Sequence, residues 1–371
     1  MVSIAFVFAI RGDIMPELGT HFHLTKEEVG WVAGAAFWGY PVAILIGGQL
    51  CDVLGMGRLL GFSFLAYVAG TALTVFAPGF WMLWTGSLCT GIANGCIEAA
   101  VNPLIATLYP REKTQKLNIV HAWFPAGIAV SGLAVYGLTR LGVHWQAKML
   151  LVLLPTVTYG VLLLGQKFPA TERVQLGFSN AGMYRETLRP LFVLWVGCMF
   201  LTAATELGPN QWIPDILTAT AGLQGILVLV WINGVMAFGR LGVGTIMRRL
   251  SPMGLLIFAA ILAGAGLFWL STAASPLAAM ASATVFAFGI CYFWPTMLGM
   301  TSETFPAGGA LLMAIIAGAG NLSVAIVLPV IGRIYDARGP RMAFRCVSAL
   351  PAILILVFGA IWLRDRARRD S

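Results

Sequence analysis

Long apolar runs separated by short polar connections make up the whole chain of 371 residues. Most runs are close to the length of about 20 residues that a helix needs to cross a bilayer. Backbone groups in lipid must satisfy their own hydrogen bonds, so continuous runs of this length predict helices. We therefore expect an all-α integral membrane protein with twelve transmembrane helices. The twelve runs lie at roughly 1–18, 29–50, 59–78, 79–108, 118–139, 146–165, 190–208, 221–242, 252–272, 276–300, 307–332 and 343–363.

The composition points to the same environment. Hydrophobic residues make up 59% of the chain and charged residues 10%, whereas soluble domains carry about 25% charged residues. A lipid bilayer is the partner that accepts this much apolar surface. The net charge of +8 then indicates where the loops lie, and we expect no nucleic-acid partner. The six cysteines show no metal-ligand spacing, so we expect no metal and no organic cofactor.

One connection is longer than the others and divides the chain. The segment "QKFPATERVQLGFSNAGMYRETLRP", which starts at residue 166, is polar, mixed in charge and interrupted by proline and glycine. Six runs precede it and six follow. This predicts two pseudo-symmetric six-helix bundles, 1–165 and 190–371, joined by a cytoplasmic linker at 166–189. Repeated halves are frequent in proteins that bind a solute near the bilayer midplane.

The basic residues predict the orientation. With both termini placed in the cytoplasm, the inner loops and a short basic C-terminal tail hold more lysine and arginine than the outer loops. This is the asymmetry that the positive-inside rule requires. The first run begins at Met1 and reaches Asp13 after only twelve residues, so we expect a truncated first helix.

Asp13, Glu98, His121 and Glu206 are titratable side chains inside apolar runs. An ionisable side chain at the centre of a bilayer costs at least about 2.5–3.5 kcal/mol on insertion scales, and such residues usually face a bundle interior or a watery cavity. They are therefore candidates for function. Arg11 lies on nearly the opposite helix face from Asp13 and is not an obvious partner for it.

Two stripes of polar residues recur at a spacing of four. Asn94, Glu98 and Asn102 share one helix face, and Thr202, Glu206 and Asn210 share another. One stripe in each half predicts a polar cavity between the halves. The alternative for the asparagines is interhelical hydrogen bonding, worth about 0.6 kcal/mol on average. Burial favours the protonated form of a carboxyl group, so Glu98, with Asp13 as second candidate, is expected to carry a proton.

Other polar and aromatic side chains extend the predicted solute site. His121 is either a solute or proton contact or a packing histidine, and Trp212 in "ELGPNQWIP" belongs either to the site or to an interfacial aromatic belt. Amides hydrogen-bond hydroxyl groups, so a small hydroxylated solute is expected. The predicted substrate-binding residues are Asn94, Asn102, His121, Glu206, Asn210, Gln211, Asn233, Trp294 and Asn321.

Two similar segments, one in each half, predict a conformational switch. "GGQLCDVLGMGRLLG" follows the second run and "FGRLGVGTIMRRL" follows the eighth. Each places glycines and basic residues in a tight cytoplasmic turn, where an ordinary turn is the alternative. The first resembles the signature turn of the major facilitator superfamily. The switch residues are Gly48, Asp52, Gly55 and Arg58, with Arg240 from the second segment.

Three further motifs, "GDIMPEL", "EAAVNPLIATLYP" and "KLNIVHAWFPAG", make the chain similar to a known family. It resembles the fucose–proton symporter branch of the major facilitator superfamily, a group of mostly sugar transporters. The resemblance implies that Asp13 and Glu98 serve proton coupling and sugar binding, together with Asn102. His121 stands where the fucose symporter has glutamine, and Glu206 is an additional acid. Still closer bacterial relatives imply the cytoplasmic (inner) membrane of a bacterium.

These patterns together predict a monomeric secondary active transporter. We expect it to move a small polar solute, a sugar, by alternating access and proton-coupled symport; sodium is the alternative coupling ion. Efflux of amphipathic compounds and a non-transporting sensor or truncated remnant are the competing functions. An enzyme is not expected, because HExxH, GxSxG and GKS/T motifs do not occur in the sequence.

Overall fold

The computed structural model describes residues 1–109, 113–170, 185–247, 250–305 and 309–370, and this part of the chain contains helices but no strand. The first half comprises α1 (Val2–Phe22), α2 (Lys26–Leu54), α3 (Met56–Val75), α4 (Phe80–Leu108), α5 (Lys113–Arg140), α6 (Trp145–Leu150) and α7 (Leu153–Leu163). The second half comprises α10 (Pro190–Ala221), α11 (Gly225–Met247), α12 (Pro252–Thr272), α13 (Pro276–Ile290), α14 (Phe293–Thr304), α15 (Gly309–Arg338), α16 (Pro340–Val347) and α17 (Ala349–Asp370).

These helices form the twelve predicted spans within the described residues. Ten spans are long and apolar enough to cross a membrane, and α1 and the apolar part of α11 supply the other two. Three spans consist of two consecutive helices each: α6 with α7, α13 with α14, and α16 with α17. The twelve-helix fold class is therefore confirmed. The division at 166–189 stays a prediction.

The predicted seventh run ended too early. It stopped at residue 208, whereas α10 continues through Pro209 and Pro214 to Ala221. Proline removes one backbone hydrogen bond but can remain inside a spanning helix where neighbouring helices surround it. Both prolines are buried. Gly222, in the left-handed conformation with φ of 66°, ends the helix.

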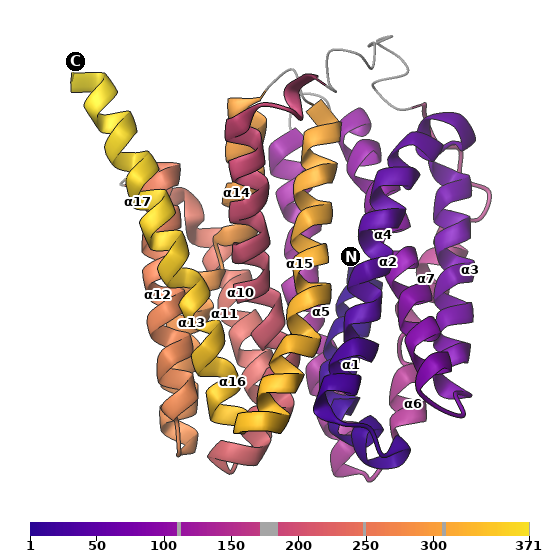
Figure 1. Ribbon diagram of the computed structural model, residues 1–371. Coiled ribbons are helices and arrows are strands. Elements are labelled where there is room, and N and C mark those ends of the chain that lie inside the picture. Colours follow the sequence, from indigo (N-terminus) through magenta and orange to yellow (C-terminus); the bar gives the residue numbers. More distant parts are fainter. Residues whose placement is uncertain (110–112, 171–184, 248–249, 306–308, 371) are drawn as a thin grey trace.

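The helices lie roughly alongside one another (Figure 1). We call the end that carries residues 166–170 and 185–189 the linker end, and the end with the turn between α1 and α2 the far end. Large apolar side chains are more than half exposed on the outside, among them Phe62, Leu65, Phe238 and Leu356. A surface of this kind needs an apolar solvent. The protein is an integral membrane protein.

Helix α2 is the common neighbour of both halves, because it packs against α4 on one side and α15 on the other. Glycines make both approaches close. A Cβ atom added to Gly91 of α4 would lie 1.9 Å from the Ala36 oxygen, and one added to Gly30 of α2 would lie 2.6 Å from the Leu328 oxygen. Small residues allow such backbone contact between helices in membranes. This packing fixes the spacing of the helices around the centre.

Gly91→Ala should disturb this packing, because the added methyl group overlaps backbone atoms that cannot rotate away. We expect an unfolding temperature in detergent lower by several degrees, since overpacking typically costs about 1–3 kcal/mol. Gly197→Ala is the matched control, as nothing lies within 4 Å of its added Cβ. Equal unfolding temperatures for the two variants would contradict the close approach of α2 and α4.

Candidate functional site

A cavity of about 80 Å³ lies between the two halves. Its wall includes side chains from α1, α2, α4 and α5 on one side and from α10, α11, α14 and α15 on the other. The polar and charged members of the wall are Arg11, Tyr40, Asn94, Glu98, His121, Glu206, Arg240 and Asn321, and Trp294 is next to them. The predicted cavity between the halves is therefore present, and polar residues of both stripes contribute to it.

Glu98 is the acid that the first half contributes to the wall. Its Oε2 accepts a hydrogen bond of 2.7 Å from the hydroxyl of Tyr40. No lysine, arginine or histidine that the structure describes forms an ion pair with it. Asn94, one turn earlier on α4, accepts a hydrogen bond from the hydroxyl of Tyr67. Tyrosine hydroxyls from α2 and α3 therefore orient Glu98 and Asn94.

Glu206 is the acid that the second half contributes. Arg240 Nη2 lies 3.3 Å from Glu206 Oε1, and Arg240 Nε donates to the carbonyl oxygen of Cys291 at 3.2 Å. Glu206 is only 2% exposed. Its second oxygen, Oε2, has no hydrogen-bond donor among the described residues. One carboxylate oxygen of Glu206 is therefore paired with Arg240, and the other is a free hydrogen-bond acceptor.

Arg11 is the second arginine of the wall, and its surroundings differ from those of Arg240. Its Nη2 donates to the Thr90 hydroxyl at 3.2 Å, and that hydroxyl donates in turn to the Ser87 carbonyl. The side chain is 6% exposed. A hydroxyl group is a neutral partner, so the charge of Arg11 is not balanced within this contact.

His121 enters the wall from α5. Its Nε2 lies 3.1 Å from Asn102 Oδ1, so one predicted site residue positions another. Asn102 itself does not line the cavity. On the opposite wall, Asn321 donates to the Ala317 carbonyl of its own helix and keeps its amide oxygen for other partners.

Four other predicted residues lie away from this wall. Asn210 and Asn233 donate to carbonyls of their own helices, those of Glu206 and Leu229. Gln211 donates to the Phe8 carbonyl at 2.9 Å and so joins α10 to α1. The structure gives these amides packing contacts, and they are not among the residues that line the cavity.

Asp13 is the fourth, and it forms a separate ion pair. Its Oδ2 lies 3.1 Å from Lys148 Nζ and 3.4 Å from the Thr139 hydroxyl. Lys148 is 1% exposed and also pairs with Glu17. Asp13 does not line the cavity, so the structure does not bring the two predicted proton carriers, Asp13 and Glu98, together there.

The predicted switch residues have mixed outcomes. The surroundings of Gly48 and the side chain of Asp52 lie outside what the structure describes. Gly55 occupies the turn before α3 with φ of 85°, and Arg58 is exposed on α3. The placement of Arg240 in a cytoplasmic turn was wrong, because α11 continues to Met247 and Arg240 lies within it, paired with Glu206.

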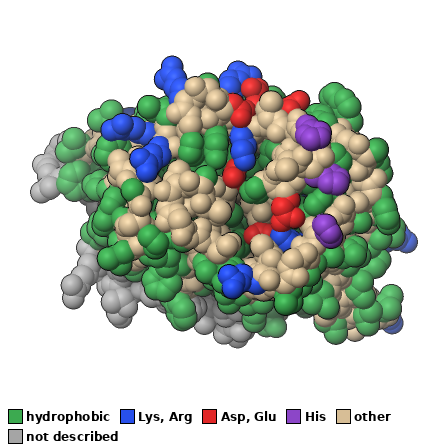
Figure 2. Space-filling view, turned by 90° about the horizontal axis from the view of Figure 1, so that it is seen from below, with side chains coloured by type: hydrophobic (Ala, Val, Ile, Leu, Met, Phe, Trp, Pro, Cys, Tyr) green, Lys and Arg blue, Asp and Glu red, His purple; other side chains and the backbone are tan. Residues whose placement is uncertain are grey.

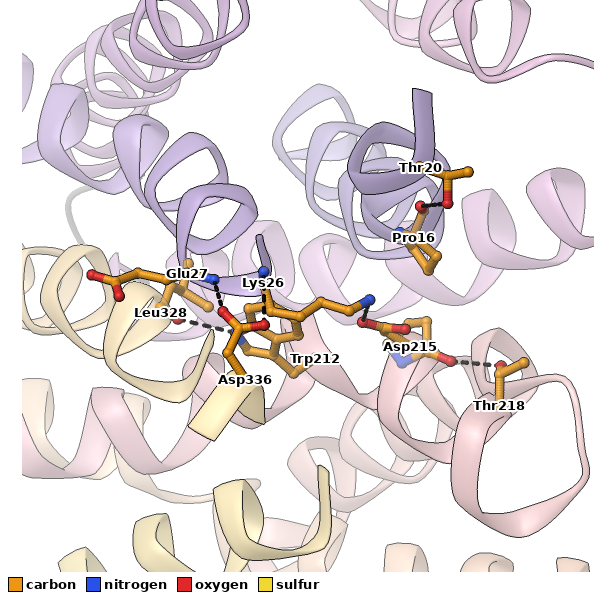
Figure 3. Close-up of polar contacts among 10 residues, drawn as sticks. Pro16, Thr20, Lys26, Glu27, Trp212, Asp215, Thr218, Leu328 and Asp336 are labelled. Atoms are coloured by element: carbon orange, nitrogen blue, oxygen red, sulfur yellow. Dashed lines mark hydrogen bonds and ion pairs between the residues drawn. The ribbon is translucent and has the colours of Figure 1, made fainter. Parts of the chain in front are cut away.

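The far end is closed by a cluster that the sequence analysis missed. We define the far-end cluster as Lys26, Glu27, Asp215, Arg333 and Asp336. Lys26 Nζ lies 2.6 Å from Asp215 Oδ2, and Arg333 Nη2 lies 2.5 Å from Glu27 Oε1. Each contact crosses between the halves, and the one between Lys26 and Asp215 is seen in Figure 3. Acidic and basic side chains gather on this end of the molecule (Figure 2).

Asp336 binds the backbone of the other half. Its two carboxylate oxygens accept from the backbone N–H groups of Lys26 and Glu27 at 3.1 and 2.9 Å (Figure 3). These N–H groups belong to the first turn of α2, where backbone N–H groups have no acceptor within the helix. The positive end of the helix dipole lies at the same place. Trp212 adds a bond to the Leu328 carbonyl beneath the cluster. Charge and backbone bonds therefore hold α2 to α10 and α15 at this end.

A family model supplies the classification. The model of the Major Facilitator Superfamily matches residues 1–310. The chain belongs to the major facilitator superfamily. The predicted superfamily is confirmed, and membership points to a transporter and not an enzyme.

Curated relatives of the chain are named as transporters of different solutes. The chain is 28% identical to the 3-(3-hydroxy-phenyl)propionate transporter of Escherichia coli, over 65% of this chain and 62% of that protein. It is 20% identical to the gentisate transporter of Corynebacterium glutamicum, over 71% and 62%. It is 26% identical to myo-inositol transporter 1 of Candida albicans, over 46% and 30%. The chain thus spans about three fifths or less of the length of these relatives.

Solved structures of the superfamily share the fold. The xylose transporter XylE from E. coli aligns with a TM-score of 0.78 at 15% identity, over 96% of this chain and 94% of that one. FucP in the outward conformation aligns with a TM-score of 0.64 at 18% identity, over 97% of both chains. These likenesses confirm the twelve-helix major facilitator fold.

Lys148→Met should destabilise the protein, because it leaves the Asp13 carboxylate buried without a cation. Breaking such a pair costs about 3–5 kcal/mol, so we expect the unfolding temperature in detergent to fall by several degrees. Adding Asp13→Asn should restore most of the loss, and the exposed Lys167→Met should change little. A double variant no more stable than Lys148→Met would show that the pair is not what holds α1 to α6.

Arg333→Glu should open the far end, because it places two acids opposite each other. An Asn321→Cys reporter on the cavity wall should then react a few-fold faster with a membrane-impermeant maleimide added from the far-end side, since exposed ion pairs are worth about 0.2–1 kcal/mol. Combining Arg333→Glu with Glu27→Arg restores opposite charges and should slow the reaction again. An unchanged labelling rate in Arg333→Glu would show that the ion pair between Glu27 and Arg333 does not keep this end closed.

Proposed function

We propose that this chain is a secondary active transporter that carries a small hydroxylated solute through the cavity by proton symport. The environment of Glu98 is the main support. Its carboxyl group lies on the cavity wall with a tyrosine hydroxyl as hydrogen-bond donor and no ion-pair partner among the described residues. Protonating it therefore breaks no ion pair. The group is therefore suited to bind a proton on one side and release it on the other.

The other two acids are less suited to carry the proton. Protonating Glu206 would leave Arg240 without its ion-pair partner, and protonating Asp13 would break one of the two ion pairs of the buried Lys148. An uncompensated buried charge is costly. The predicted part of Asp13 in proton coupling stays a prediction, and its ion pair favours a structural role.

Several wall residues suit a solute with hydroxyl groups. Glu206 Oε2 lacks a donor, and a solute hydroxyl would supply one. The amide oxygen of Asn321 is a second free acceptor on the same wall. The relatives include transporters named for myo-inositol, D-xylose, gentisate and 3-(3-hydroxy-phenyl)propionate, and all four of these compounds carry hydroxyl groups. A sugar remains the substrate that the sequence predicts.

Efflux of amphipathic compounds is the second candidate. Phe8, Phe37 and Phe124 make part of the wall apolar, which favours it. A purely lipophilic solute, however, would leave the charged and amide groups of the wall without partners, and unsatisfied polar groups are expensive in a low-dielectric site. The polar solute therefore fits the whole wall better.

Alternating access accounts for the far-end cluster. With that end closed by ion pairs, the cavity would be reached from the linker end, which is the cytoplasmic end if the termini lie in the cytoplasm. Release of the cluster and closure of the linker end would expose the same site to the other side of the membrane.

Glu98→Gln should abolish accumulation driven by a pH gradient while sparing exchange of solute. The test uses purified protein in liposomes with D-xylose, myo-inositol, gentisate and 3-(3-hydroxyphenyl)propionate as the panel. Wild type should accumulate at least one of them under an imposed gradient, and a protonophore should prevent it. Because glutamine mimics the protonated acid but cannot release a proton, Glu98→Gln should retain counterflow of that solute without accumulation.

Glu186→Gln, at the linker end and outside the cavity, is the control and should behave as wild type. Accumulation by Glu98→Gln at the wild-type level would show that another group carries the proton.

A further inference from the structure

Arg11 is a buried cation with very little to neutralise it. Among the described residues its one hydrogen-bond partner is the Thr90 hydroxyl, at 3.2 Å from Nη2. A guanidinium has five N–H donors and stays charged at every physiological pH. The side chain lies on the cavity wall and is 6% exposed. Most of its donors are therefore left for a partner that the described chain does not supply.

None of the acids of the neighbourhood forms an ion pair with Arg11 among the described residues. Asp13 lies two positions along α1, on nearly the opposite face, and pairs with Lys148. Glu206 pairs with Arg240. Glu98 accepts from Tyr40 and lies two turns along α4 from Thr90, a distance of about 12 Å along the helix axis.

Arg240 shows what a satisfied arginine looks like in the same cavity. It holds a carboxylate at 3.3 Å and a backbone carbonyl at 3.2 Å. Arg11 has neither a carboxylate nor a carbonyl oxygen among its described partners. A buried charge of this kind is expensive unless it is paired, and in a membrane it marks a functional site by default.

The surface beside Arg11 is aromatic. Phe8 lies three residues before it and therefore on the same face of α1. Its ring packs edge-to-face on Phe37 and Phe124, with centroid distances of 6.3 and 5.8 Å. All three rings line the cavity. A group bound to the guanidinium would thus meet an apolar surface about one helical turn away.

We propose that Arg11 binds the carboxylate of the transported solute, and that this solute is a small organic acid whose body packs on Phe8, Phe37 and Phe124. Arginine recognises carboxylates through two parallel N–H···O bonds, and the free donors of Arg11 permit this geometry. The assignment rests on the proposed transport function. It narrows the hydroxylated solute to a hydroxylated carboxylic acid and makes Arg11 the residue that sets specificity.

The test compares ligands that differ only in the charged group. Binding of 3-hydroxybenzoate and of 3-hydroxybenzyl alcohol to the purified protein is measured by titration calorimetry, with D-glucose and D-glucuronate as sugar probes. We expect wild type to bind 3-hydroxybenzoate at least about tenfold more tightly than the alcohol, because charge-assisted hydrogen bonds are the strong ones. Equal affinities for 3-hydroxybenzoate and 3-hydroxybenzyl alcohol, or binding of D-glucose in preference to both carboxylates, would overturn the assignment.

Variants of Arg11 locate the effect. Arg11→Gln should abolish the preference for the acid, and Arg11→Lys should retain part of it, because lysine keeps the charge but loses the planar fork. Arg338→Gln, exposed at the end of α15, is the control and should keep the full preference. A preference that survives in Arg11→Gln would contradict the proposal. If that variant does not fold, the ligand comparison in wild type and Arg11→Lys still decides.

Stability separates recognition from a merely structural role. Without ligand, Arg11→Gln should unfold at the same temperature as wild type or a higher one, because it removes an uncompensated buried charge. A clear loss of stability would indicate that Arg11 serves to hold α1 against α4.

The binding measurements need no proton gradient, so they separate this site from proton coupling. Binding through Arg11 without gradient-driven uptake would contradict the proton coupling but support this site. Proton-driven uptake of neutral sugars alone would keep the proton coupling but rule out carboxylate binding by Arg11.

Discussion

The cost of placing charge in a low-dielectric interior governs how this bundle is organised. Asp13 and Lys148 join α1 to α6, and Glu206 and Arg240 join α10 to α11. Each pair satisfies its charges within one half, so both halves can move relative to each other without exposing either pair. Glu98 and Arg11, which have no ion-pair partner among the described residues, lie on the wall between the halves. The uncompensated groups therefore occur where a solute and a proton can reach them.

Much of the fold follows from the length and apolarity of the runs, since backbone in lipid has few alternatives to a helix. The site was less predictable. A spacing of four identifies which residues share a helix face but not how the helix is rotated in the bundle. Asn94 and Glu98 lie on the cavity wall as expected, whereas Asn210, equally well spaced, bonds its own helix. Arg240 was placed in a turn because glycines follow it, yet α11 continues beyond them.

The far-end cluster and the importance of Arg11 also escaped prediction, for different reasons. Glu27 and Arg333 are separated by most of the chain, and only the packing of α2 on α15 brings them together. Arg11 was visible as a charge in an apolar run, but its significance depends on where its neighbours find their partners. Those partners are visible only in the folded protein, where Lys148 pairs with Asp13 and the Tyr40 hydroxyl donates to Glu98.

Proline contributes to the second half by supplying acceptors. Pro295 has no N–H for the Cys291 carbonyl one turn earlier, and Arg240 donates to that carbonyl. The interruption between α13 and α14 therefore helps to position the arginine that pairs with Glu206. A change in the bend of this span would alter the ion pair on the cavity wall.

The attachment of Asp336 to α2 is made to backbone N–H groups, which every residue except proline possesses. Asp336 can consequently hold this helix start whatever side chains, other than proline, stand at positions 26 and 27. The side chains of Lys26 and Glu27 are thereby left for the ion pairs with Asp215 and Arg333, so one helix start makes two independent sets of contacts, of which only the ionic set depends on the identity of its residues.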